Sequence, residues 1–355
     1  MHDPQLYGLP VSIEKPKPHF FSSPPRPFLA STPNREAFEM IKRGSNFCFE
    51  GTYGTAMAFY SWVKKQVNLL YPISDYKTSR INRDKLREFS QRLFVRIKNQ
   101  NIDLVNAPKI PWLQEFYSDF DDYYLPFTEV LGMNGAWQWW VNGIQVPGLM
   151  HKVHPFYGVY FPTRFEHLQL FDQWLSQNKS ISSAMDLGTG CGVLTFYMMK
   201  HGVKNILATD INPNSLYSVS KELERLKGEK FVRLKHASFF EGLDTKELDL
   251  VVFNPPWIPE KPSNSLDLAM YYQPDYFQLF FQQAYSALPI GCRLVMLYST
   301  YAQVAGIEKM HPIEYEVNSN KRFKLVQKVD KPLSQVSISK KNWLTHIRQF
   351  ERVEL

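Results

Sequence analysis

Residues 184–257 constrain the fold of this chain more than any other stretch. They contain three short apolar runs, residues 184–187, 206–209 and 250–253, separated by segments with helical spacing. Apolar strands that alternate with helices predict a parallel sheet covered on both faces. Because ligands bind at the carboxyl ends of such strands, we expect the residues that follow the three runs to meet in one crevice.

A glycine-rich turn follows the first run, with Gly188, Gly190 and Gly192 at every second position. This spacing differs from the dinucleotide-binding fingerprint, and the turn lacks the basic residue of a phosphate-binding loop. Without side chains, the glycines let a ligand lie against the backbone where a helix begins. A simple tight turn is an equally good interpretation of this pattern alone.

Asp210 ends the second run, where dinucleotide-binding folds place the acid that binds ribose. A carboxylate at this position can accept hydrogen bonds from both ribose hydroxyls. The alternative is that Asp210 caps the following helix. Asn212 or Asn214 can fill that role instead, which leaves Asp210 for a ligand.

The third run ends in Asn254-Pro255-Pro256-Trp257, the most specific motif of the chain. Prolines fix φ and lack an N–H donor, so the loop is stiff and leaves carbonyls unpaired. The side-chain oxygen of Asn254 and the Pro255 carbonyl can each accept one N–H of an NH2 group, and Trp257 offers a flat face for stacking. The motif suits a conjugated amine or amide, and the alternative is an ordinary proline turn after a strand.

These motifs together resemble the class I S-adenosylmethionine-dependent methyltransferases. Within that class they resemble the N-methylating branch marked by [N/D]-P-P-[Y/F/W], which includes HemK-type release-factor glutamine methyltransferases and ribosomal-RNA guanine-N2 and adenine-N6 enzymes. The resemblance runs from about residue 155 to the end of the sequence. The asparagine form, followed by residues 258–260, favours the glutamine and ribosomal-RNA enzymes over the DNA adenine enzymes.

The resemblance implies a Rossmann-like α/β fold with a seven-stranded methyltransferase sheet, S-adenosylmethionine as cofactor, and methyl transfer to an amide or amino nitrogen. Asp186 would hold the methionine ammonium, and Asp210 the ribose. The implied catalytic set is Asn254, Pro255, Pro256 and Trp257. The implied cofactor set is Asp186, Gly188, Thr189, Gly190, Gly192, Asp210, Ile211, Ser238, Thr163 and Asn254, with no metal site.

Two positions of the cofactor set leave alternatives open. Ser238 stands where the family often has an aspartate that binds the adenine amino group, and a hydroxyl can still accept that bond. The segment 158–166, which contains Thr163, resembles the part of the family that covers the cofactor. Pro162 and Glu166 are equally typical of the first turn of a helix.

The first 150 residues match no family known to us. We expect a proline-rich arm over residues 1–30, attached through Phe20 and Phe21, and an α+β accessory domain for substrate recognition over 31–150, followed by the methyltransferase domain over 151–355. Helical signals predict helices from Pro33 to about residue 43 and over 55–70, and a basic amphipathic helix over 77–98.

Asn-Gly steps at 134–135 and 142–143 predict β-hairpins over 125–161, with Trp137 and Trp139 on one face and Trp140 on the other. In the methyltransferase domain, residues 261–274 are expected to border the target pocket through Tyr271 and Tyr272. Further elements are expected as helices over 165–175 and 276–288, a strand over 293–298, and an antiparallel edge pair over 323–329 and 347–353.

Composition limits the partners. Among 355 residues, 44% are hydrophobic, yet no apolar run approaches the roughly 20 residues of a membrane span, and the first residues lack a signal-peptide pattern. Cys48, Cys191 and Cys292 form no C-x-x-C pair, so a cytoplasmic protein without disulfides or zinc is expected. The net charge of +7, interpreted as spread along the chain, is compatible with an RNA or ribosomal partner.

Three functions fit these observations. The first is an N-methyltransferase that acts on a macromolecule, either an RNA base or a protein glutamine. The second is a small-molecule amine N-methyltransferase, and the third is a non-enzymatic binding protein with the methyltransferase fold. A closed pocket of small-molecule size would favour the second, and an open basic cleft would favour RNA.

Overall fold

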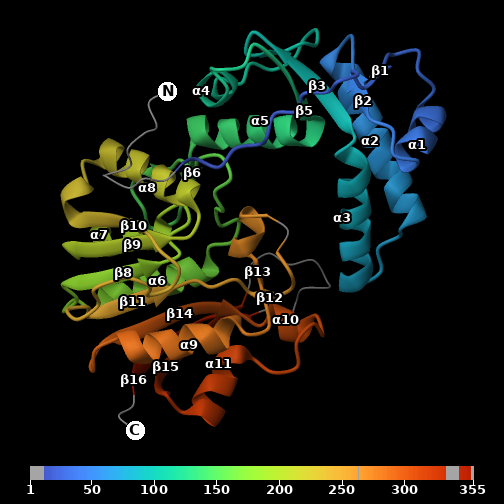
Figure 1. Cartoon of the computed structure of the whole chain (residues 1–355). Coiled ribbons are helices and arrows are strands. Elements are labelled where there is room, and N and C mark those ends of the chain that lie inside the picture. Colours follow the sequence, from blue (N-terminus) through green and yellow to red (C-terminus); the bar gives the residue numbers. More distant parts are fainter. Residues whose placement is uncertain (1–11, 263, 333–343, 353–355) are drawn as a thin grey trace. The chain divides into compact units, whose positions relative to one another are not determined.

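The chain folds into two compact units, described from a computed structural model (Figure 1). The structure describes residues 12–262, 264–332 and 344–352. The N-terminal unit comprises Lys15–Gln138, and the C-terminal unit comprises the described residues from Trp139 onward together with residues 12–14. The first 11 residues of the expected arm and Val353 lie outside the described residues.

The N-terminal unit contains a small mixed sheet, with strand order β1-β2-β3-β4 and β5 also paired with β3. β1, β2 and β3 run parallel, while β4 and β5 run antiparallel to β3. The strands are β1 Arg26–Phe28, β2 Phe47–Phe49, β3 Leu93–Lys98, β4 Asn101–Ile102 and β5 Asp122–Pro126. The proline-rich segment thus contributes an edge strand, the place in a sheet where proline is tolerated.

The aromatic residues of this segment pack on the unit as predicted. Phe21 lies edge-on to Phe94 and Tyr124, with ring centroids 5.0 and 5.4 Å apart, and Phe20 packs on Phe120 at 5.5 Å. The arm is therefore held by ring contacts as well as by β1.

The helices of this unit are α1 Asn34–Lys42, α2 Tyr53–Leu70, α3 Tyr76–Ser90 and α4 Trp112–Phe116. The first two predicted helices are confirmed, and Thr52 caps α2 by accepting a hydrogen bond from Thr55 N. The predicted basic helix over 77–98 is wrong over residues 91–98, because α3 ends at Ser90 and 93–98 is β3. Most of β3 is buried within the sheet, so pairing with β2 and β5 outweighs the helical spacing of its apolar residues.

The predicted hairpins over 125–161 are also wrong, because most of that range is helix α5, Phe127–Asn142. Phe127, Val130 and Met133 recur every third residue and are all buried, so the helical period decides, and the Asn-Gly step at 134–135 lies inside the helix. Only a short antiparallel pair remains, β6 Ile144–Gln145 with β7 Lys152–Val153.

The three tryptophans therefore project from a helix, and alternation does not apply to them. Trp137 lies edge-on to Trp112 with ring centroids 5.1 Å apart. Trp140 packs on Phe156 at 5.4 Å, and Trp139 on Phe161 at 5.4 Å, although Trp139 stays 45% exposed.

The C-terminal unit is built on a sheet of seven strands in the order β10-β9-β8-β11-β14-β16-β15. The first five are parallel, and β16 runs antiparallel to both β14 and β15, which confirms the predicted edge pair. The strands are β8 Ser183–Leu187, β9 Asn205–Asp210, β10 Val232–His236, β11 Leu250–Phe253, β14 Arg293–Ser299, β15 Phe323–Pro332 and β16 Leu344–Arg352.

Helices cover both faces of this sheet, as the alternation of strands and helices predicts. Along β11, Val251 and Phe253 join the core that α9 packs against, while Leu250 and Val252 point to the other face and are equally buried. The helices are α6 Glu166–Gln177, α7 Val193–Lys200, α8 Pro213–Leu226, α9 Tyr276–Ala287, α10 Tyr301–Val304 and α11 Pro312–Tyr315.

Within the described ranges, no helix is both long and apolar enough to cross a membrane. Over the same residues, no group of three or more histidine, cysteine or acidic side chains is placed to hold a metal ion. Cys48, Cys191 and Cys292 are free thiols, each buried separately.

Candidate active site

The three motifs converge on one cavity of about 470 Å³ at the carboxyl ends of β8, β9 and β11. Gly188 and Gly190 line it from the turn after β8, Asp210 from the end of β9, and Asn254 from the end of β11. The crevice expected from the parallel sheet is therefore present, and its walls come from residues far apart in the sequence.

The glycine turn has a backbone that other residues rarely adopt. Gly188, Gly190 and Gly192 have φ of +70°, +54° and +86°, in the left-handed region where a side chain is strained. A Cβ on Gly192 would lie 2.8 Å from the Phe196 ring, so this glycine is also required by packing. Gly188 and Gly190 instead present bare backbone to the cavity, together with Thr189.

Asp186 lies beneath the turn, fully buried and off the cavity wall. Its Oδ2 accepts hydrogen bonds from the Thr189 and Thr195 hydroxyls at 2.9 and 2.7 Å and from Thr195 N at 3.0 Å. Its Oδ1 is buried and has no partner among the described residues. Burial raises the pKa of Asp186 to about 6, against the opposing effect of these hydrogen bonds.

Asp210 faces the cavity and organises two turns at once. Its Oδ2 accepts from Gly190 N and its Oδ1 from Asn212 N, both at 2.8 Å. Asn212, not Asp210, caps α8 by accepting from Asn214 N at 3.0 Å, which leaves Asp210 on the cavity wall. Burial raises the pKa of Asp210.

Part of the proline loop lines the cavity, and part of it is packed behind the cavity wall. Asn254 and Pro256 line the cavity, and the Asn254 Oδ1 is buried without a partner in the described structure. Pro255 and Trp257 are not lining residues. The Trp257 ring packs on His167 of α6, and its Nε1 is likewise buried without a partner.

The far wall of the cavity comes from the insertion after the proline loop, as predicted. β12 Ile258–Pro259 pairs with β13 Tyr271–Tyr272, and both tyrosines line the cavity. The Tyr272 hydroxyl donates to Glu308 Oε2 at 2.7 Å, which fixes that ring. Lining residues from the same insertion are Pro262, Ser265, Leu266, Leu268, Ala269, Gln273 and Pro274.

The remaining residues of the predicted cofactor set do not all line the cavity. Ser238 and Ile211 line the cavity, whereas Thr163 does not. Tyr160 and Pro162 line it in place of Thr163. α6 begins at Glu166, whose Oε2 accepts a hydrogen bond from Phe165 N at 3.2 Å, so the segment is a helix start next to a stretch that covers the cavity.

His167 and Tyr276 are residues of this region that sequence reasoning missed. His167 is buried against Trp257, and burial lowers its pKa to about 4. Tyr276 lines the cavity at the start of α9, and burial raises its pKa. Nothing in the local sequence marks His167, because a Glu-His pair at a helix start is normally solvated.

The charge of the wall is negative. Asp210 and Asp275 are its charged members, and no lysine, arginine or histidine occurs among the described lining residues. Most of the rest is apolar or aromatic, and it includes Tyr271, Tyr272 and Tyr276. The wall therefore suits a neutral or cationic ligand and offers no partner for a phosphate.

Comparison with known proteins agrees with this description. Residues 168–327 match the family model described as the methyltransferase small domain. A Methanocaldococcus jannaschii protein provisionally named a protein N5-glutamine methyltransferase is 25% identical over 197 residues, which are 51% of this chain and 92% of that protein.

Two further relatives match over shorter stretches. The release factor glutamine methyltransferase of Borreliella burgdorferi is 29% identical over 23% of this chain and 28% of its own length. The ribosomal protein uL3 glutamine methyltransferase of Xanthomonas campestris is 27% identical over 30% of this chain and 34% of its own length. The chain thus spans about a third or less of these two relatives. A solved ribosomal protein L11 methylase of Lactobacillus delbrueckii aligns with a TM-score of 0.40 at 19% identity, over 59% of this chain and 91% of that one.

The parallel sheet, the glycine turn and the family match define the C-terminal unit as a class I S-adenosylmethionine-dependent methyltransferase domain. Within that class, the relatives that match include proteins named as glutamine methyltransferases, which methylate nitrogen.

The residues present fit the cofactor of this class. The bare backbone at Gly188 and Gly190 gives room for close approach, Asp210 offers acceptor oxygens at the wall, and Asp186 keeps one buried oxygen without a partner. A buried acceptor that lacks a partner indicates a donor supplied by a ligand.

Proposed function

We propose that this protein transfers a methyl group from S-adenosylmethionine to the side-chain amide nitrogen of a glutamine in a protein. One observation carries the proposal. The Asn254 Oδ1 is buried on the cavity wall without a hydrogen-bond partner, in a loop made rigid by two prolines. Leaving such an acceptor unpaired is costly, so the site is complete only when an N–H donor enters.

The sheet-side half of the cavity would hold the cofactor, which supplies an electrophilic methyl group on a sulfonium. Asp210 would accept the ribose hydroxyls, since its carboxylate lies on the cavity wall and is held there by the backbone N–H groups of Gly190 and Asn212. Asp186 lies behind the cavity wall and would attract the ammonium of the methionine part through water bound to its unpaired oxygen. The remaining contacts would come from Gly188, Thr189, Gly190, Ile211 and Ser238, which line the cavity, and from Gly192, which supports the turn.

The proline loop would bind the acceptor. The Asn254 oxygen would accept one hydrogen of the amide NH2 and turn the nitrogen towards the methyl group. Pro255 does not line the cavity, so the predicted role of its carbonyl as the second acceptor is not part of this proposal. Alignment of this kind contributes about 7–11 kcal/mol at best to lowering a barrier. The amide enters neutral and releases its proton after attack, so no strong base is required at the wall. Trp257 contributes from behind the wall, by holding the loop against His167.

The wall favours a glutamine over a nucleotide. A base on an RNA strand brings phosphates with it, and the described lining residues contain two acids and no base. The relatives from M. jannaschii, B. burgdorferi and X. campestris are all named for glutamine methylation.

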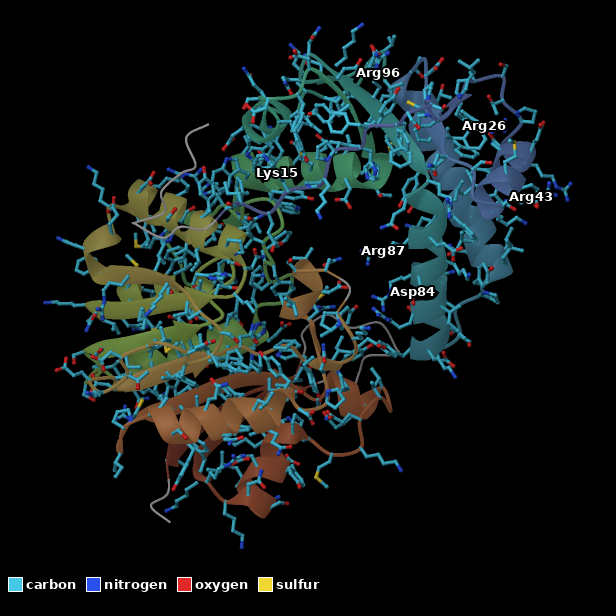
Figure 2. All side chains as sticks on the ribbon, viewed as in Figure 1. Lys15, Arg26, Arg43, Asp84, Arg87 and Arg96 are labelled. Carbon is cyan, nitrogen blue, oxygen red and sulfur yellow. The ribbon has the colours of Figure 1, made fainter. Side chains whose placement is uncertain are left out.

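The N-terminal unit would recognise the protein that carries this glutamine. Residues 15–138 hold 17 lysines and arginines against 12 aspartates and glutamates, a net charge of +5 out of +7 for the whole chain. The interpretation that the excess is spread along the chain is therefore wrong. Figure 2 shows Arg26, Arg43, Arg87 and Arg96 on separate elements of this unit, so the charge is distributed over it. Such a unit suits an acidic protein or one bound to a ribosome.

The test uses methyl-labelled S-adenosylmethionine and an extract of cells that lack this protein. We expect label in the protease-sensitive fraction, released as methylamine when acid hydrolyses the amide. The control is Asn254→Ala, which should bind the cofactor and transfer no label. Label in the nuclease-sensitive fraction would instead identify RNA as the acceptor. Label only in small molecules would identify a small-molecule enzyme, and cofactor binding without any transfer would indicate a binding protein.

A further inference from the structure

Residues 157–162, which we term the roof segment, cover the glycine turn of the cavity. Tyr160 and Pro162 line the cavity from this segment. The Tyr160 carbonyl oxygen lies 3.5 Å from the position a Cβ on Gly190 would take, so the roof runs directly over the turn. The position of the roof segment therefore sets the shape of the part of the cavity proposed for the cofactor.

Two asparagines at the start of α8, the N-cap Asn212 and Asn214 of the first turn, hold the start of the roof segment. Asn212 donates from Nδ2 to the Gly158 carbonyl at 2.9 Å, and Asn214 donates from Nδ2 to the Tyr157 carbonyl at 2.8 Å. The backbone N–H of Asn212 also donates to Asp210 Oδ1. The roof and the acid on the cavity wall are thus fixed by the same short turn.

Asn214 makes a second attachment, to a residue 200 positions earlier in the chain. The Glu14 N–H donates to Asn214 Oδ1 at 2.7 Å, and Asn214 Nδ2 donates to the Glu14 carbonyl at 2.8 Å. The Asn214 side chain is 1% exposed, and both hydrogens of its amide are used. Since it binds only main-chain atoms of Glu14, the attachment does not depend on the side chain at position 14.

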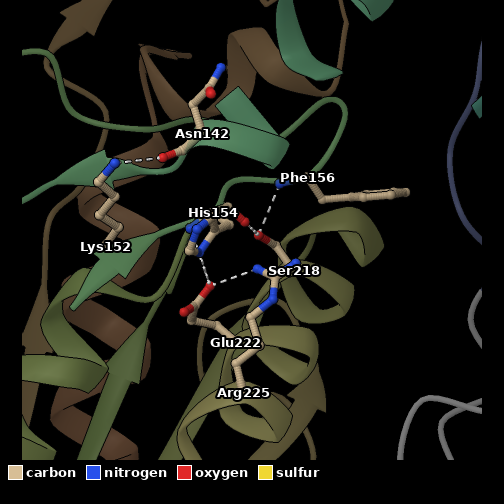
Figure 3. Close-up of polar contacts among 7 residues, drawn as sticks. All are labelled: Asn142, Lys152, His154, Phe156, Ser218, Glu222 and Arg225. Carbon is tan, nitrogen blue, oxygen red and sulfur yellow. Dashed lines mark hydrogen bonds and ion pairs between the residues drawn. The ribbon is translucent and has the colours of Figure 1, made fainter. Parts of the chain in front are cut away.

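The segment just before the roof has its own attachments to α8, shown in Figure 3. The Ser218 hydroxyl accepts a hydrogen bond from Phe156 N at 3.1 Å. Glu222 Oε2 lies 2.9 Å from His154 Nδ1 and accepts from the Arg225 guanidinium at 3.1 Å. These contacts end at Phe156, and the hydrogen bonds from Asn214 and Asn212 hold the carbonyls of the next two residues. Farther along the roof, Phe161 packs on Trp139.

We propose that Asn214 is a positioning residue for the cofactor, and that its hydrogen bonds to the main chain of Glu14 are part of this role. The Asn214 amide joins the chain at residue 14 to the first carbonyl of the roof segment. Loss of either attachment frees the start of the roof and weakens cofactor binding, although neither residue lines the cavity. This inference depends on the proposed cofactor site and extends it to a residue outside the predicted motifs.

The test measures binding of S-adenosylmethionine to the full chain by titration calorimetry. We expect Asn214→Ala to weaken binding at least about tenfold, because the Glu14 and Tyr157 carbonyls and the Glu14 N–H lose the partner that the buried Asn214 amide supplies. Glu14→Pro removes the N–H donor and should weaken binding about threefold or more. Glu14→Ala keeps the backbone N–H and carbonyl, and its affinity for S-adenosylmethionine should match that of the wild type within about twofold. The double variant Asn214→Ala/Glu14→Pro should bind S-adenosylmethionine no more weakly than Asn214→Ala alone, since both changes remove the same attachment.

Ser218→Ala is the matched control, because it breaks a hydrogen bond of the same segment ahead of the roof. Its affinity should stay near the wild-type value, which separates roof position from general loosening of the segment. Hydrogen exchange of the ligand-free protein gives a second readout: amides of residues 157–162 should exchange faster in Asn214→Ala and Glu14→Pro only. Unchanged affinity in Asn214→Ala, or an equal loss in Ser218→Ala, would overturn the proposal. A wild-type protein that binds no cofactor would instead reject the proposed function.

Discussion

The imidazole of His167 stands edge-on to the indole of Trp257, with ring centroids 5.0 Å apart and ring planes at 80°. His167 is only 3% exposed, and its low pKa keeps the ring neutral at physiological pH. Neither the His167 Nδ1 nor the Trp257 Nε1 has a partner among the described residues, so the contact is one of ring packing. This packing supports the loop that carries Asn254 from its buried side.

We expect His167→Ala to lower the free energy of unfolding by about 2–4 kcal/mol, because it leaves a cavity against Trp257. It should also reduce the methyl transfer rate, since the loop loses its support. His167→Phe keeps a ring at the contact and should retain most of the stability and most of the transfer rate. Urea unfolding measures the stability, and single-turnover transfer measures the rate. A rate in His167→Ala equal to that of the wild type would exclude a supporting role.

Two buried groups give the unfolding free energy opposite dependences on pH. The pKa of Asp186 is raised to about 6, so its contribution is present below about pH 4 and is lost as pH rises through 6. The pKa of His167 is lowered to about 4, so its contribution is present above about pH 6.5 and is lost as pH falls through 4.

Between pH 4 and 6 we therefore expect these two contributions to oppose one another, each by at most about 1.4 kcal/mol per pH unit. Asp186→Asn should make the protein lose stability more steeply on acidification, and His167→Phe should make the loss shallower. Urea midpoints from pH 4 to 7 measure both slopes. Slopes that change in the same direction in the two variants would show that one of the two shifts is misassigned.

Asn254→Ala should lower kcat about 100- to 1000-fold, the usual cost of removing one aligned hydrogen-bonding group. The dissociation constant for S-adenosylmethionine should stay within about twofold, because Asn254 is assigned to the acceptor. Asn254→Asp keeps an acceptor oxygen at the same place and should recover part of the rate. Calorimetry and initial rates separate the two effects, and an equal loss of cofactor affinity would refute this assignment.

Asp210→Ala should behave in the opposite way, weakening cofactor binding about 10- to 100-fold while kcat at saturating cofactor changes little. The control is Asp249→Ala, which also removes a carboxylate that accepts backbone N–H bonds, from Ser182 and Ser183, but away from the cavity. That variant should lose stability and keep cofactor affinity. An unchanged affinity for S-adenosylmethionine in Asp210→Ala would rule out the assignment of Asp210 to the ribose.

The sequence was sufficient for the sheet and the cavity because both depend on local patterns. Apolar runs that end in Gly188, Asp210 and Asn254 fix where strands stop, and parallel order then places the three ends together. The helix over 127–142 was missed because an Asn-Gly step indicates a turn only when its flanks can pair as strands. β3 was missed because burial on a central strand outweighed helical spacing.

Other features of the site depend on contacts between distant parts of the chain. Nothing near position 167 or 257 in the sequence predicts that these two rings meet. The attachment of Glu14 to Asn214 uses main-chain atoms at position 14, so no choice of side chain there could reveal it. The position of Trp257 behind the cavity wall likewise follows from the turn of the proline loop in three dimensions.

Gly192 of the glycine turn can be compared with Gly202, which lies after α7 and has the same backbone conformation. Gly192 and Gly202 have φ of +86° and +85°, but a Cβ on Gly202 meets no atom within 4 Å, whereas one on Gly192 lies 2.8 Å from Phe196 and 3.0 Å from Val219. Gly202→Ala should therefore lower the free energy of unfolding by the left-handed strain alone, about 1–2 kcal/mol.

Gly192→Ala adds overpacking of about 1–3 kcal/mol to the same strain. Because the clash displaces the start of α7 beneath the turn, this variant should also weaken S-adenosylmethionine binding, which Gly202→Ala should not do. Thermal unfolding and calorimetry on the two variants measure the difference. Equal losses in both would mean that backbone strain alone explains the need for glycine at position 192, and that the packing of Phe196 adapts to a methyl group.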